Sequence, residues 1–197
     1  MKNRSSFVMA LVGALIALAL IPSAFAQSGN AMVRVVHASP DAPAVDVWIN
    51  GSKVDALTNV PFFTASGYLP LPAGSYDILV VPAGQTSPAV IDAKGVTISA
   101  GMAYTIAATG FLSNIQPTIL VDNLSAPEAG KAHVRVIHTS PDAPAVDIRV
   151  AGGPALISNL AFPNASDYLP VDAGTYNPEV TPAGTTTVVL PINGVAP

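Results

Sequence analysis

The sequence predicts an all-β protein, built as a tandem of antiparallel β-sandwiches. Short segments of alternating apolar and polar residues recur about every 8 to 12 residues, with Pro and Gly between them and no helical period. The segment 34–47 (RVVHASPDAPAVDV) returns with few changes at 135–148 (RVIHTSPDAPAVDI), 101 residues later. Solenoid repeats are shorter, about 20 to 50 residues, so each copy is expected to hold its own core.

The first copy begins with two strands joined by a stiff turn. Residues 33–37 alternate and place His37 on the same face as two valines. The turn 39–43 (SPDAP) ends this strand, because proline fixes φ and the Ser and Asp side chains bond nearby backbone groups. A second strand over 44–50 ends at Asn50-Gly51, a strong hairpin signal.

Six further short strands complete the first copy, separated by turns that contain Pro or Gly. They are expected over residues 68–71, 75–81, 89–92, 96–98, 103–108 and 118–122. Tyr68, Tyr76 and Tyr104 are expected to bond backbone groups through their hydroxyls, as tyrosines near strand corners do. Seven or eight strands with this spacing are typical of an antiparallel sandwich.

The second copy keeps the pattern and then stops early. Its Tyr168 lies 100 residues after Tyr68, so one residue is missing near the hairpin at 152–154. Nothing follows that resembles the first copy beyond Val96 or Thr97. We expect the second domain to lack its last strands, either because the chain is a fragment or because a partner donates a strand, with a minimal domain as the third alternative.

The domain boundaries follow from these patterns. Residues 1–26 have the parts of a secretory signal: basic Lys2 and Arg4, an apolar run over 7–21 and the cleavage site Ala24-Phe25-Ala26. An uncleaved anchor is the alternative, but the run is shorter than the roughly 20 residues of a span. Domain 1 is expected over 32–124, a polar linker over 125–131 and domain 2 over 132–197. We therefore expect a secreted or extracytoplasmic protein with no membrane span in the mature chain.

Composition excludes several classes of function. Without its signal the chain has a net charge of −6, and its cations are scattered, which excludes binding to nucleic acid. It has no cysteine, so disulfides and thiol chemistry are absent. Charged residues make up 10%, against about 25% in typical globular proteins, and this favours an exported β-protein over a cytosolic enzyme.

One repeated block holds the candidate site residues of each copy. They are Arg34, His37, Ser39, Asp41, Asp46 and Trp48 in the first copy, and Arg135, His138, Ser140, Asp142 and Asp147 in the second. A catalytic triad is disfavoured, because residues two apart on a strand lie about 6.6 to 7 Å apart and triad partners meet at about 3 Å. We therefore expect no catalytic residue, no cofactor and no enzyme.

Three other interpretations of the block remain open. A metal site at His37 with Asp41 or Asp46 would have too few ligands. The turn 39–43 with Trp48 could contact a glycan, peptide or protein, but Arg149 replaces Trp48 in the second copy. The favoured interpretation is structural. His37 would bond a turn from the inner face, Asp41 would cap that turn, and Asp46 would pair with Arg34.

The block also carries a resemblance. Residues 35–46, followed by 67–76 and 103–110, resemble the DUF4397 family, a domain of unknown function. The Pro-Ala-Gly-x-Tyr element within 67–76 is similar to elements of immunoglobulin-like and transthyretin-like sandwiches. The resemblance covers the first copy fully and the second up to about Val195. It implies an exported, mostly bacterial protein of the cell envelope or exterior, often with tandem domains, and it implies no activity, cofactor or catalytic residue.

These observations predict a noncatalytic module. We expect a secreted or cell-surface protein with a structural or interaction role of the adhesion type. Its partner would be a cell-surface protein or a glycan. The alternative is a carbohydrate- or metal-binding module of the cell envelope.

Overall fold

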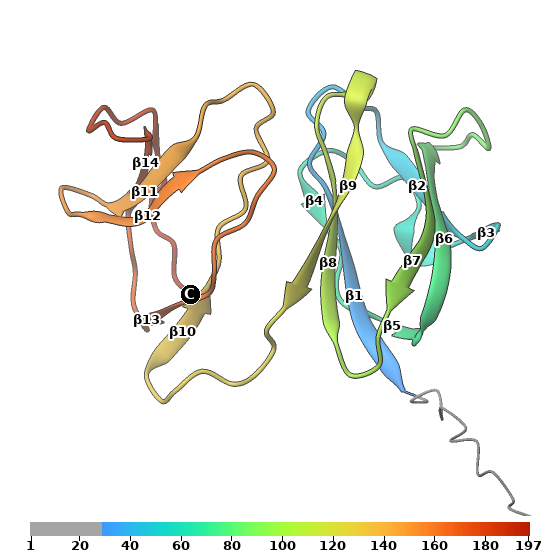
Figure 1. The fold of residues 1–197 in the computed structure, drawn as a ribbon, viewed down its shortest axis with the longest axis horizontal. Coiled ribbons are helices and arrows are strands. Elements are labelled where there is room, and N and C mark those ends of the chain that lie inside the picture. The colour runs from blue at the N-terminus through green and yellow to red at the C-terminus, as the bar shows by residue number, and fades with distance from the viewer. Residues whose placement is uncertain (1–28) are drawn as a thin grey trace, which may run out of the picture.

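The protein is all-β, as expected. The computed structural model describes residues 29–197, and the signal predicted over 1–26 lies outside them. Strands make up 49% of the structure, and the helical residues within 29–197 form two single turns, η1 (Asp55–Leu57) and η2 (Leu112–Asn114). No helix in this range is long and apolar enough to cross a membrane. Two β-rich halves lie side by side, joined by the segment between β9 and β10 (Figure 1).

The first half contains a sheet centred on β1 (Asn30–His37) and β8 (Ala103–Thr109). Its order is β4-β1-β8-β9, with β4 (Thr64–Ala65) and β5 (Leu69–Pro72) on one edge of β1 and β9 (Gln116–Asp122) at the far edge. The β1 and β8 strands are parallel, with Met32 opposite Ala103 and His37 opposite Ala108. The expectation of a wholly antiparallel fold is therefore wrong at this pair. Parallel neighbours need a crossover, which residues 38–102 supply by building the second sheet.

The second sheet of this half is antiparallel, in the order β3-β2-β6-β7. It contains β2 (Val45–Ile49), β3 (Ser52–Lys53), β6 (Gly74–Pro82) and β7 (Ile91–Ile98). The predicted hairpin at Asn50-Gly51 is confirmed, since both residues have positive φ, 48° and 78°, as a type I′ turn requires.

The strands predicted over 89–92 and 96–98 are one strand, β7. The β6–β7 register shifts between Tyr76 and Ile78, and Gly95 in β7 has a φ of 64°. A glycine with this φ at a register shift is typical of a β-bulge, which bends a strand without ending it. The glycine that suggested a turn therefore marks a bulge.

The two sheets of the first half share one core. Its thirteen buried members come from both sheets and from the segment 57–60: Ala31, Val33, Val45, Val47, Leu57, Val60, Ile78, Val80, Ile91, Ile98, Tyr104, Ile106 and Ala108. All seven residues of β8 are buried. That strand therefore contributes strongly to the closure of this half.

The second half contains a similar sheet and a shorter one. Its strands β12 (Ala155–Leu160), β11 (Val146–Val150), β14 (Pro178–Pro182) and β15 (Leu190–Pro191) lie in that order. The strand β10 (Lys131–Val134) pairs only with β13 (Leu169–Asp172). Within residues 29–197 no strand follows β15, and the core has three buried hydrophobic residues, Val146, Ile148 and Leu160.

Candidate functional site

The imidazole of His37 fastens the end of β1 to the repeated turn. His37 is fully buried, and its Nε2 donates to the carbonyl oxygen of Pro43 at 2.9 Å. Its Nδ1 accepts from the Ser39 amide at 3.4 Å. The equivalent His138 has the same bond, from Nε2 to the Pro144 carbonyl at 3.1 Å. Both nitrogens of His37 face backbone groups, so this histidine is committed to the turn, as the structural interpretation expects.

The side chains of Ser39 and Asp41 do not bond His37. The hydroxyl of Ser39 is buried without a partner among the described residues. Oδ1 of Asp41 accepts from the amide of Leu112 in η2 at 2.7 Å. The expected local cap by Asp41 is therefore wrong, because the carboxylate joins the turn to the loop after β8. In the second half Asp142 instead accepts from the Ser140 hydroxyl at 3.4 Å.

The carboxylate of Asp46 bonds three donors on other segments. Its Oδ1 accepts from the Asn59 amide at 2.7 Å, and its Oδ2 accepts from the Gly84 amide at 3.0 Å and Lys53 Nζ at 2.7 Å. The Lys53 hydrogen bond, followed by the two amides, lowers the pKa of Asp46 to about 2. The expected pair of Asp46 with Arg34 is wrong, because β2 and β1 lie in different sheets.

Asp147 repeats the backbone part of this arrangement. It accepts from the amide of Asn159 at 2.7 Å and from that of Gly184 at 2.9 Å. These hydrogen bonds, that of Asn159 first, lower the pKa of Asp147. A buried carboxylate with two backbone donors holds loops together, and this is its role in both halves.

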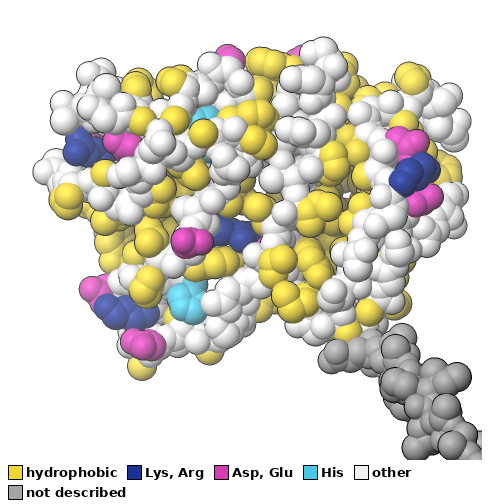
Figure 2. All heavy atoms as spheres, in the orientation of Figure 1, with side chains coloured by type: hydrophobic (Ala, Val, Ile, Leu, Met, Phe, Trp, Pro, Cys, Tyr) yellow, Lys and Arg dark blue, Asp and Glu magenta, His cyan; other side chains and the backbone are white. Residues whose placement is uncertain are grey.

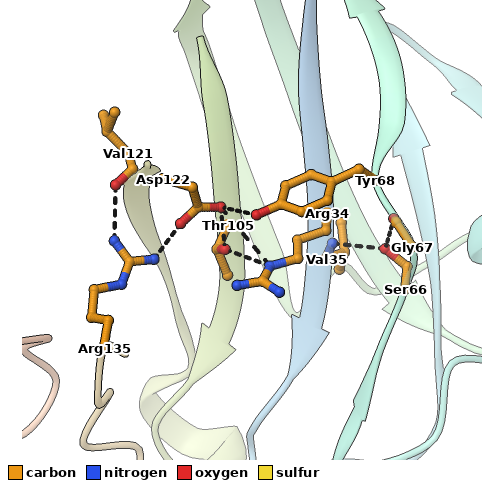
Figure 3. Close-up of polar contacts among 9 residues, drawn as sticks. All are labelled: Arg34, Val35, Ser66, Gly67, Tyr68, Thr105, Val121, Asp122 and Arg135. Atoms are coloured by element: carbon orange, nitrogen blue, oxygen red, sulfur yellow. Dashed lines mark hydrogen bonds and ion pairs between the residues drawn. The ribbon is translucent and has the colours of Figure 1, made fainter. Parts of the chain in front are cut away.

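The arginines of the block, unlike its other members, converge on one residue, Asp122 at the end of β9 (Figure 3). The carboxylate of Asp122 is fully buried, and its Oδ2 accepts from Tyr68 Oη at 2.7 Å and Thr105 Oγ1 at 2.6 Å. Arg34 lies 3.9 Å from the same oxygen and donates from Nε to Thr105 Oγ1 at 2.8 Å. Tyr68 therefore bonds a carboxylate where backbone was expected.

Arg135 reaches Asp122 from the second half. Its Nη2 donates to Oδ1 of Asp122, and its Nη1 donates to the Val121 carbonyl at 2.8 Å. Burial alone would raise the pKa of Asp122, but the hydrogen bonds from Thr105, Tyr68 and Arg135 together lower it. Each guanidinium also stacks on a tyrosine, Arg34 over Tyr68 at 5.0 Å and Arg135 over Tyr168 at 4.7 Å. Asp122 thus joins the two halves.

Sequence reasoning missed Asp122 and an exposed aromatic pair. The available signal for Asp122 was its place as a charged residue at the end of an apolar strand, in a chain with few charges. Phe62 and Phe63 lie between η1 and β4 and are 46% and 85% exposed. Phe63 also has a φ of 61°, an uncommon value for a bulky residue. Trp48, the aromatic residue chosen from sequence, instead has its indole nitrogen buried.

An apolar cleft of about 650 Å³ opens in the second half. It lies between the inner faces of that half and is lined by Val134, Val136, Ile148, Val180 and Leu190, among others. Figure 2 shows hydrophobic side chains gathered between the two sheets there. Leu190, opposite Val180, is 54% exposed, whereas Ile91, opposite Val80, is 6% exposed. The same register position is thus open in one half and closed in the other.

These arrangements support structural roles for the polar block. Within residues 29–197 no three His, Asp or Glu side chains lie close enough to hold a metal ion together. The carboxylates of Asp41, Asp46 and Asp147 bond backbone amides, and Asp122 bonds side chains that position strands. The accessible surface that stands out chemically is the apolar cleft of the second half.

A protein-family model matches a large part of the chain. The model of a family described as a domain of unknown function (DUF4397) matches residues 31–149. The matched region starts in β1, covers the first half and ends in β11. Since this is a single match, the expectation of two tandem copies stays a prediction. No curated protein matches the chain.

Proposed function

Because the chain belongs to the DUF4397 family, whose description assigns no activity, we propose from its geometry that it is a noncatalytic interaction module of the adhesion type. The signal expected at residues 1–26 supports a location outside the cytoplasm, secreted or at the cell surface. The partner would be a cell-surface protein or a glycan.

The proposed architecture is a tandem of immunoglobulin-like or transthyretin-like sandwiches. The identical order of β3-β2-β6-β7 and β12-β11-β14-β15 supports this interpretation. The repeated bonds of His37 and His138 and of Asp46 and Asp147 also support it.

The proposal rests on where the His and Asp residues and the exposed apolar side chains lie. The His and Asp residues of the first turn block bond backbone groups, whereas apolar side chains of the second half remain open to solvent. Exposed apolar patches of this kind commonly mark interaction sites. The open cleft is therefore the proposed contact surface.

Binding of the mature chain, residues 27–197, to bacterial envelope fractions tests the proposal. Leu190→Asp places a charge in the cleft at an exposed position, so it should weaken binding at least tenfold while the fold is kept. Ile119→Asp is the matched control, since Ile119 is 43% exposed on β9 of the first half. Equal binding by Leu190→Asp and the wild type would contradict the proposal, as would hydrolytic turnover that Asp41→Asn abolishes.

A carbohydrate-binding function is the second candidate, and Phe63 favours it. Its ring is 85% exposed, and its amide donates to the His37 carbonyl at 2.8 Å, which holds the residue in place. Exposed aromatic rings offer large contact area to a ligand. A glycan array compared between wild type and Phe63→Ser separates the two candidates, because only this second one predicts a signal that Phe63→Ser removes.

A further inference from the structure

We infer that the first half binds a small uncharged amphiphile, whose hydrocarbon chain occupies an apolar cavity between the two sheets and whose polar end lies at the cavity mouth. The cavity is in a different half from the proposed contact surface, so this ligand site is independent of the proposed function. Three observations lead to it: the volume of the cavity, the place of its mouth and the chemistry of its wall.

The cavity lies between the inner faces of the two sheets and has a volume of about 280 Å³. Val35, Leu71 and Ile106 line it from the sheet of β1 and β8, and Val47 and Val80 line it from the facing sheet. Protein interiors hold few voids larger than a water molecule. An apolar cavity of roughly 150 Å³ binds benzene, so this one has room for a hydrocarbon up to about twice that size.

Side chains beside the cavity lack part of their packing. Val35, Leu69 and Leu71 are on the inner face of the first sheet but are only partly buried. On the far side of the cavity, Ile91 and Ile106 are 6% and 8% exposed. A side chain that borders an empty space loses dispersion contacts on that side. A hydrocarbon chain in the cavity would supply these contacts.

The cavity opens between the edge strands β3 and β5. Ser52 and Lys53 of β3 and Pro70 of β5 line it and are exposed. Within residues 29–197 neither of these strands has a second neighbour in its sheet. On the opposite side of the sandwich, β7 and β9 approach each other. The first half is therefore closed along one pair of strand edges and open along the other.

The wall of the cavity selects an uncharged chain. Among the described residues, Ser52 and Lys53 are the two lining residues with polar side chains, and both lie at the mouth. The ammonium group of Lys53 already bonds Asp46 Oδ2 at 2.7 Å, so its charge is paired. A charge or a hydroxyl carried deeper would be buried without a partner, which is costly.

Ser52 defines the polar end of the ligand. It lies opposite Ile49 in the β2–β3 hairpin, and residues paired across two strands share a face. Since Ile49 lines the cavity, the Ser52 hydroxyl is on the cavity side of β3. A hydroxyl both donates and accepts, and it therefore suits a small uncharged polar group such as an alcohol. The ligand class is an alkyl chain that ends in such a group.

Urea unfolding followed by Trp48 fluorescence tests the inference. Trp48 is the single tryptophan of the chain and lies in β2, so its signal reports the first half. 1-Octanol should raise the urea midpoint saturably, because a ligand of the folded state stabilises it. 1,8-Octanediol has the same length but would bury its second hydroxyl, so it should bind at least tenfold more weakly. Equal binding of the two, or no shift with 1-octanol, would overturn the inference.

A series of 1-alkanols tests for a cavity of limited size in the unchanged protein. The affinity should rise with chain length and stop rising once the chain fills the cavity. An open apolar surface would instead bind each longer alkanol more tightly, since the buried apolar area keeps growing. A continuous rise up to 1-dodecanol would therefore contradict binding in the cavity.

Two matched substitutions assign the site to one half. Val136 is the counterpart of Val35, 101 residues later, and their amides donate to the hydroxyls of Ser166 and Ser66. Val35→Phe fills the cavity, so it should abolish the shift caused by 1-octanol without lowering the urea midpoint of the free protein. Val136→Phe should keep the full shift. An unchanged shift in Val35→Phe, or a loss confined to Val136→Phe, would overturn the assignment.

The circular dichroism spectrum checks that these variants fold. Leu71→Phe fills the same cavity from β5 and takes the place of Val35→Phe if that variant does not fold. The expected result is again the loss of the 1-octanol shift, and a shift equal to that of the wild type would contradict the inference.

Discussion

The carboxylate of Asp46 connects separate segments of the first half, because it bonds two backbone amides and Lys53 at once. Removing it leaves buried donors without partners, which costs about 1–3 kcal/mol. We expect Asp46→Ala to lower the free energy of unfolding by about this amount in urea titrations at pH 7. A loss below about 0.5 kcal/mol would contradict a structural role for this residue.

The pH dependence of Asp46 has a defined sign. Its pKa of about 2 in the folded chain lies below the roughly 3.9 of an unfolded Asp. The carboxylate therefore stabilises the fold above about pH 4, and this contribution is lost as the pH falls towards 2. Urea midpoints measured between pH 2 and pH 6 should fall more steeply for wild type than for Asp46→Asn. Parallel curves would show that the folded carboxylate has an ordinary pKa.

His37 permits a comparison between the halves. Since its ring is buried and bonds the Pro43 carbonyl, His37→Ala should cost about 1–3 kcal/mol in thermal or urea unfolding, and His138→Ala should destabilise the second half through the same bond. Unchanged stability of both variants, together with lost envelope binding, would instead make the histidines part of a contact surface.

Sequence reasoning succeeded for His37 because its position needs only local information. Strand alternation places it inward, and the adjacent turn supplies the acceptor. The partners of Asp46 and Asp41 could not be predicted in this way. Leu112 is distant in sequence from Asp41, and Lys53 reaches Asp46 through the hairpin after β2. Strand alternation carries no information on which sheet each strand joins.

At the scale of elements, β7 illustrates how a glycine can be misinterpreted. Gly95 has a φ of 64°, and a Cβ there would lie 3.8 Å from Ser75 Oγ, an ordinary contact. Gly95→Ala should therefore cost about 1 kcal/mol through backbone strain alone. Gly67→Ala is the matched control, because Gly67 has open space and no positive φ. Equal melting temperatures of the two variants would exclude the bulge.

The strand β8 shows the other limit of prediction. Its residues and boundaries follow from a β-branched, apolar segment between glycines, and the predicted range 103–108 is close to the observed one. Its parallel pairing with β1 could not be predicted from the sequence, because the two strands are joined through an entire second sheet. Contacts between strands so far apart in the chain depend on the packing of the whole half.

At the scale of the whole molecule, Asp122 connects the halves. Removing one partner from a buried ion pair costs about 3–5 kcal/mol, and Arg34 at 35% side-chain exposure places this site at the low end. We expect Asp122→Asn to lower stability by about 3 kcal/mol. A double-mutant cycle with Arg135→Gln measures the link itself, and a coupling energy near zero would show that the halves are independent.

The most direct test of the open second half is hydrogen–deuterium exchange of the mature chain, residues 27–197. The amides of His133 and Thr139 should exchange much faster than those of Met32 and Ala38, their counterparts 101 residues earlier, which donate to the carbonyls of Met102 and Ala108. Equal protection of the two pairs of amides would contradict an open edge at β10.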